Sequence, residues 1–201
     1  MNDLDMPQLL ALAAALGWAS GIRLYLVVLL TGLAGYLGWV PLPGGLQMLA
    51  HPVVIAASGF MVFVEFFADK IPGLDSLWDM VHTVIRIPAG AALAASVFGA
   101  DHAAMALVAA LLGGSFAATA HAAKATTRAA INTSPEPFSN VAASLAEDVT
   151  VVGGLALAIA HPITFLCLLA IFVALLVWLL PKLVRLALTP FRRMARSRQK
   201  P

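Results

Sequence analysis

Charged residues are scarce in this sequence. Asp, Glu, Lys and Arg make up 11% of its 201 residues, whereas 61% are hydrophobic. Soluble domains carry about a quarter of their residues as these four charged types. One hydrophobic core cannot hide this much apolar surface, but a lipid bilayer can. The composition therefore excludes an ordinary soluble domain and predicts an integral membrane protein of one domain.

Cysteine is almost absent, and the first part of the chain has no basic residue. Cys167 lies in an apolar run, which excludes a disulfide framework and a thiolate metal site. No Lys or Arg precedes Arg23, so the start of the sequence lacks the positive region of a signal peptide. No segment is long, polar and low in complexity. We therefore expect no soluble appendage with a separate activity.

The basic residues that are present crowd the end of the sequence, where seven of the 12 occur (Lys182, Arg185, Arg192, Arg193, Arg196, Arg198 and Lys200). A basic segment directly after an apolar span is more typical of a cytoplasmic anchor than of a nucleic-acid patch. We therefore predict a transmembrane domain over residues 1–190, a basic cytoplasmic tail over 191–201, and no nucleic-acid partner.

Long apolar runs fill the rest of the chain. They predict helices over 9–40, 52–68, 76–98, 103–131, 140–160 and 163–180, because a membrane-spanning helix needs about twenty apolar residues. The runs are continuous and do not alternate with period two, which favours helices over a barrel. The fold class is therefore an all-α polytopic bundle with about six crossings.

Two of these stretches are too long for one span and contain glycine. Ser20 and Gly21 interrupt the first, and Gly113 and Gly114 interrupt the second, which predicts broken or re-entrant helices. The order of elements also occurs twice. We therefore predict a 3+3 inverted repeat of residues 8–98 and 103–185 about a two-fold axis in the membrane plane.

The loops that would face outward, 41–50, 99–102 and 161–162, contain no Lys or Arg. Positive residues favour the cytoplasmic side. With six crossings, this predicts a multi-pass protein of the bacterial inner membrane with both termini in the cytoplasm.

Ionisable residues interrupt the apolar stretches at helical spacing. Asp75, Asp79, His82 and Arg86 step by four, three and four, so they share one helix face. Charge in hydrocarbon is costly and usually faces the bundle interior. We therefore predict one interior polar core, formed by Glu65, Asp69, Asp79, His82, Glu147 and Asp148. A plainer alternative is that Asp69, Lys70, Asp75 and Asp79 cap helices and that Lys124 and Arg128 snorkel to the interface.

Three functions fit such a core. The first is a small transporter or flippase, proton- or cation-coupled, for a small anion or an anionic lipid head group. Arginine suits planar oxyanions, so the predicted substrate-binding residues are Arg23, Arg86, Lys124 and Arg128, with Glu65 and Glu147 titrating.

The second function is a membrane-embedded enzyme that acts on lipid phosphates and holds a divalent cation at Glu65, Asp69, Glu147 and Asp148. The third is a scaffold. No His-Glu-x-x-His or Gly-x-Ser-x-Gly motif is present, and we expect no other cofactor. The expected partners are the bilayer and a small solute, ion or lipid head group, with a homo-oligomer left open.

The same residues carry a family resemblance. Glu65, Asp69, Lys70, Pro72 and Asp75 form a specific Glu-x3-Asp-Lys-x-Pro-x2-Asp string. Together with Ser20-Gly-Ile-Arg23, Arg86, Lys124, Arg128, Asn132 and Glu147-Asp148, it resembles a family of bacterial integral membrane proteins known as domain of unknown function 4126. The resemblance covers about residues 15 to 155. It supports the choice of site residues and implies no particular substrate.

Overall fold

The computed structural model describes residues 4–71, 73–132 and 137–197, and this part of the chain consists of helices joined by short turns. Its α-helices are α1 (Met6–Tyr36), α2 (Pro52–Ala68), α3 (Leu74–Ser96), α4 (Ala103–Ile131), α5 (Pro137–Ala160) and α6 (Pro162–Ser197). Two short 3-10 helices, η1 (Gly44–Ala50) and η2 (Ala100–His102), lie between them. The predicted all-α bundle is confirmed.

Several of these helices can cross a membrane. Within the described residues, α1, α4, α5 and α6 are long and apolar enough, and η1 with α2 forms a further pair bent by 68°. The outward faces of the bundle carry large exposed apolar side chains on successive helices (Phe60, Leu111, Val149 and Leu175). Such faces are costly in water and suit lipid.

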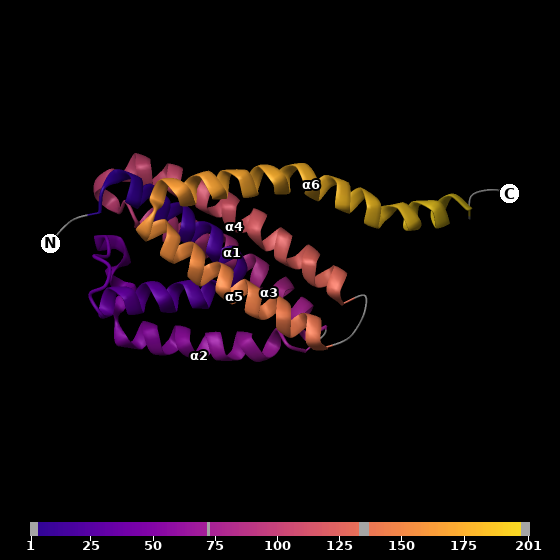
Figure 1. Ribbon diagram of the computed structural model, residues 1–201, viewed down its shortest axis with the longest axis horizontal. Helices are drawn as coiled ribbons and strands as arrows, with labels where there is room; N and C mark the ends of the chain where they lie inside the picture. Colours follow the sequence, from indigo (N-terminus) through magenta and orange to yellow (C-terminus); the bar gives the residue numbers. More distant parts are fainter. Residues whose placement is uncertain (1–3, 72, 133–136, 198–201) are drawn as a thin grey trace.

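The first helix folds back on itself. Its backbone leaves helical geometry at Arg23 (φ −142°, ψ 75°). Leu12 of the first arm and Thr31 of the second line one small cavity, although 19 residues separate them. The two arms therefore lie side by side, and α1 starts and ends at the same end of the bundle (Figure 1). This is the predicted re-entrant helix.

The break lies elsewhere than predicted. Ser20 and Gly21 are within regular helix, and the irregular residue is Arg23. The glycines of the first arm serve packing instead. A Cβ at Gly17 would lie 2.5 Å from the Cα of Gly113 in α4, so the two backbones are in direct contact. Small residues on facing helices allow this close approach in membranes.

The fourth helix is continuous, so the predicted interruption at Gly113 and Gly114 is wrong. Gly113 is enclosed by α1 and by Gly90 and Ala94 of α3, which leaves no room for a side chain. The two halves consequently begin differently, with a folded α1 and a straight α4. The inverted repeat of residues 8–98 and 103–185 stays a prediction.

The fold of α1 also decides where the chain ends lie. Because α1 returns to its starting end and five helices follow it, the start of α1 and the end of α6 lie at opposite ends of the molecule (Figure 1). The placement of both termini in the cytoplasm stays a prediction. Residues 191–197 of the predicted tail continue α6, and residues 198–201 lie outside the described residues.

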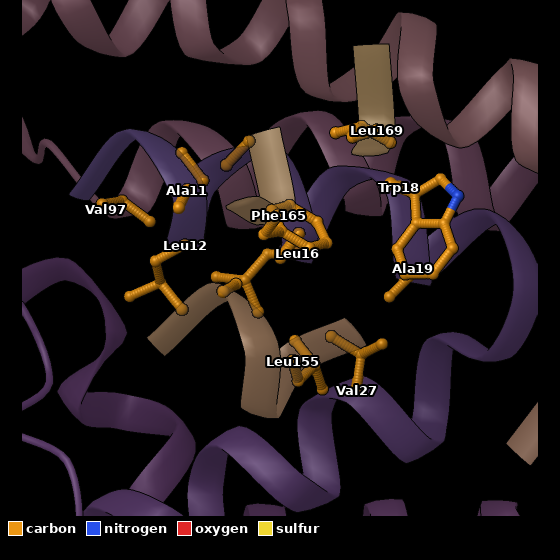
Figure 2. Close-up of a cluster of buried hydrophobic side chains, with 14 of the residues drawn as sticks. Ala11, Leu12, Leu16, Trp18, Ala19, Val27, Val97, Leu155, Phe165 and Leu169 are labelled. Carbon is orange, nitrogen blue, oxygen red and sulfur yellow. The ribbon is translucent and has the colours of Figure 1, made fainter. Parts of the chain in front are cut away.

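A continuous apolar core joins the arms of α1 to α5 and α6. Leu12, Leu16 and Val27 from the two arms meet Leu155 of α5 and Phe165 of α6 (Figure 2). This core fills the bundle on the side where α1 begins. The bend of α1 points toward the other end, where the polar residues gather.

Candidate functional site, a buried charge network

Five elements bring ionisable side chains together around the bend of α1: the bend itself, the end of α2, the first half of α3, the last part of α4 and the first half of α5. We call these nine side chains the charge network: Arg23, Arg86, Lys124, Arg128, Glu65, Asp69, Asp79, Glu147 and Asp148. The side chains of the first seven are at most 4% exposed, and those of Glu147 and Asp148 are 14% and 31% exposed.

Arg23 joins the bend to α2 and α5. Its Nη1 lies 2.5 Å from Oδ2 of Asp69, and its Nε lies 2.9 Å from Oδ1 of Asp148. Its Nη2 donates to Oγ of Ser144 at 2.6 Å. The guanidinium at the break in α1 is therefore paired on two sides, and this pairing offsets the cost of burying its charge.

Arg86 is the second paired guanidinium, and it is fully buried. It contacts Glu65 of α2 through Nη2 and Asp79 of its own helix through Nη1, the latter at 2.7 Å. Asp79 and Arg86 are seven residues apart, two helical turns, which is the register that the sequence predicts. Glu65 reaches the same guanidinium from the neighbouring helix.

Lys124 lies where the carboxylates converge. Its Nζ is 3.2 Å from Glu147, 3.3 Å from Asp79, 3.5 Å from Asp69 and 4.0 Å from Glu65. It also donates to the carbonyl oxygen of Ile22, at 3.2 Å, next to the bend. One ammonium group thus bridges α1, α2, α3 and α5, so Lys124 does not snorkel toward the interface as the plainer alternative supposes.

Arg128 closes the network toward the end of α4. Its Nη2 and Nε lie 3.0 and 3.1 Å from Oε1 of Glu147. Its Nη1 donates to the carbonyl oxygen of Asp69 and to both oxygens of Asn140. Asn140 in turn donates to Asn132, at 2.9 Å. These amide side chains connect the charges to the helix ends.

Asp75 lies apart from the cations and acts at a helix start. It accepts from the backbone N–H of Gly73 at 2.8 Å and from Nδ2 of Asn132 at 2.9 Å. For Asp75 the capping interpretation therefore describes the structure. Lys70, by contrast, lies outside the network, with its ammonium group above the ring of Phe66. Burial, followed by the charge of Arg23, lowers the Lys70 pKa.

His82 is buried beside the network and contacts none of its charged groups directly. Its Nδ1 lies 2.8 Å from the carbonyl oxygen of Trp78, so Nδ1 carries a proton and donates. The Tyr25 hydroxyl lies 3.1 Å from Nε2, and the ring stacks on Trp78. His121 makes the link instead, with Nδ1 3.4 Å from Nη1 of Arg86 and Nε2 2.6 Å from Oγ1 of Thr83.

The structure thus brings together the predicted residues other than His82, Ser20 and Gly21. The sequence analysis did not single out Tyr25 or Asn140, which lie in ordinary apolar or turn sequence. A neutral polar residue costs much less to insert into a membrane than a charged one, so its presence in an apolar run is weaker evidence for a functional site. Their placement followed only from the packing of α1 against α3 and of α4 against α5.

The network has one more carboxylate than cation, five against four. Oδ1 of Asp69 and Oδ2 of Asp79 are buried and accept no hydrogen bond within the described residues. No group of three or more His, Cys, Asp or Glu side chains there has the geometry of a metal site. The predicted divalent cation at Glu65, Asp69, Glu147 and Asp148 stays a prediction, and the carboxylates instead face Arg23 and Lys124.

Comparison with known proteins gives a family and no named relative. The model of the family described as Domain of unknown function (DUF4126) matches residues 10–182. No curated protein and no solved structure matches the chain. The match includes every residue of the charge network and most of the sequence. This protein, whose helices are long and apolar enough to cross a membrane, therefore belongs to the DUF4126 family.

Proposed function

We propose that this protein is a small multi-pass transporter in which the charge network couples the movement of a substrate to a proton or a cation. The observation that carries the proposal is a cluster of five carboxylates and four cations at a break in a membrane-type helix, with three of the carboxylates and all four cations buried. Ionisable residues at membrane depth are costly, and they commonly mark ion and proton pathways. Broken helices mark binding sites in secondary transporters.

The charge balance supports cation or proton coupling more strongly than free-anion binding. Of the predicted anion ligands, Arg23 already contacts three carboxylates and Arg86 two. A free anion would have to displace these partners and enter a region with an excess of negative charge. A proton or small cation would instead reduce that excess. Glu147 is the best exchange point, because it is partly exposed and contacts Lys124 and Arg128.

The membrane orientation also belongs to the proposal. Lys70, the end of α4 and the basic part of α6 lie at the end of the bundle that holds the charge network, whereas η1 and η2 lie at the other. We place the basic end in the cytoplasm of a bacterial inner membrane by the positive-inside rule. The start of α1 then faces outward, and Lys70 and Arg128 lie toward the cytoplasm.

Reconstitution tests the proposal. Vesicles of phosphatidylethanolamine and phosphatidylglycerol would contain the purified protein and, in parallel samples, a trapped pH-sensitive or sodium-sensitive dye. An inside-negative potential would be applied with and without sodium chloride outside. We expect proton or sodium uptake by the wild-type protein and its loss in Glu147→Gln. The matched control, Asp101→Asn, changes an exposed carboxylate at the opposite end of the bundle and should leave uptake unchanged.

Folded wild-type protein that moves neither ion would overturn the transport proposal. Magnesium-dependent release of phosphate from the vesicle lipids would then favour the enzyme. The absence of both activities would favour the scaffold.

A further inference from the structure

A cavity connects the charge network to the side of the bundle. It lies between α4 and α5, is covered by Phe172 of α6, and has a volume of about 290 Å³. Lys124 and Glu147 form its charged inner wall. Its rim includes the small side chains of Ala146 and Thr150, which are exposed on the outside of α5. The network is therefore within reach of the face that lipid would cover.

A second cavity, of about 240 Å³, continues from the first along α5 and α6. Both are lined by Trp18, Thr150 and Phe172, and the second extends to Leu157 and Leu168. Ten residues of helix separate Glu147 from Leu157, a length of about 15 Å. Trp18 lies at the edge of the apolar core, beside Phe165 and Leu169 (Figure 2). The two cavities adjoin at these shared residues, and we refer to the pair, which is charged only at the Lys124 and Glu147 end, as the channel.

The charged end is set well inside the bundle. Lys124 precedes the last residue of α4, Ile131, by seven residues, which places it about 10 Å from that helix end. A molecule could enter from the side of the bundle and place its polar part at Lys124. That polar part would then lie below the membrane surface, and the apolar part would lie in the second cavity. That geometry suits an amphiphile and does not suit a water-soluble ion alone.

We propose that this channel binds one membrane lipid with a zwitterionic head group that carries a phosphate and a primary amine. The head group would exchange partners with the Lys124–Glu147 ion pair, so that the amine pairs with Glu147 in place of Lys124 and the phosphate pairs with Lys124 in place of Glu147. One acyl chain would lie along Trp18 and Phe172 toward Leu157. The excess of carboxylate in the network argues against a purely anionic head. This inference rests on the proposed function and deepens it, because it names the class of substrate and its lateral route to the network.

Fluorescence quenching tests the site directly. A variant with Trp39, Trp78 and Trp178 replaced by phenylalanine keeps Trp18 as its one tryptophan. It would be reconstituted with phosphatidylethanolamine or phosphatidylcholine brominated in one acyl chain. Phosphatidylcholine has the same phosphate but no amine hydrogen to donate. We expect half-maximal quenching at about tenfold less brominated phosphatidylethanolamine than phosphatidylcholine, equivalent to about 1.4 kcal/mol.

Two variants of α5 locate the site. Ala146→Phe fills the mouth of the cavity and should remove the lipid selectivity. Leu145→Phe adds a ring at an exposed neighbouring position that does not line the cavity, and it should retain the selectivity. Equal quenching by the two lipids, or unchanged selectivity in Ala146→Phe, would overturn the proposal.

Two further outcomes separate this inference from its alternatives. In the first outcome, neither lipid quenches Trp18 and the protein can be cross-linked as a dimer through α5. That result would show that a second copy covers the channel, and it would overturn the proposal. Selective quenching without ion uptake would support the lipid site and refute only the coupled transport.

Discussion

Replacing Arg86 by glutamine would leave two buried carboxylates, Glu65 and Asp79, without their shared guanidinium. Removing one partner of a buried ion pair typically costs about 3–5 kcal/mol. Lys124 remains 3.3 Å from Asp79 and 4.0 Å from Glu65, which offsets part of the loss. We therefore expect the free energy of unfolding to fall by about 3 kcal/mol, the lower end of that range.

A double-mutant cycle with Glu65→Gln separates the pair from its surroundings. The single Glu65→Gln change removes one charged hydrogen bond but leaves Arg86 paired with Asp79, so we expect a loss of about 2 kcal/mol. In the double variant the unpaired Glu65 charge is gone. The free energy of unfolding of the double variant should therefore fall by about 3 kcal/mol, whereas the two single losses add up to about 5 kcal/mol. The difference is a coupling energy of about 2 kcal/mol.

The measurement is reversible unfolding in lipid bicelles, by steric trapping or denaturant titration, for the wild type and the three variants. Additive losses, within about 0.5 kcal/mol, would refute the reasoning, because residues in direct contact should couple more strongly than that. They would mean that Arg86 and Glu65 do not stabilise each other in the membrane.

Two further predictions concern the helices that hold the network. Gly17→Ala should lower the free energy of unfolding by about 1–3 kcal/mol, because the added methyl group meets the backbone of α4. Gly153→Ala, which has open space around the added methyl group, should be neutral or stabilising. Unfolding in bicelles measures both variants, and equal effects would contradict the prediction. In a cysteine-free background, Met6→Cys and Met48→Cys should react with an impermeant thiol reagent from one side and Ile71→Cys from the other. Labelling of positions 6 and 48 from opposite sides would show that α1 spans the membrane as a single helix.

The sequence was sufficient to predict the helices and most of the network, because both depend on local signals. Continuous apolar runs mark spans, and charges at spacings of three and four residues must share a helix face, as Asp79 and Arg86 do. The cost of bare charge in lipid then requires partners across helices. An interior polar core that includes Glu65 could therefore be predicted, whereas the pairing of Glu65 with Arg86, 21 residues away, is a finding of the structure.

The exact position of the break was beyond local reasoning. Glycine in a membrane helix can mark a break or a close contact, and the sequence alone does not distinguish them. Here Gly17 and Gly113 face each other across α1 and α4, and neither breaks its helix. The irregular residue, Arg23, is held by Asp69 and Asp148, partners that only the folded bundle supplies.

The bend at Arg23 has a consequence for synthesis of the chain. Its partners Asp69 and Asp148 are made 46 and 125 residues later. At about 5–20 residues per second, Asp148 follows Arg23 by roughly 6–25 s. Arg23 has neither carboxylate partner until Asp69 is made, and it lacks the second until Asp148 is made, so the hairpin carries incompletely paired charge throughout that interval. The first segment to be made is therefore among the last to settle, after α5 has entered the membrane.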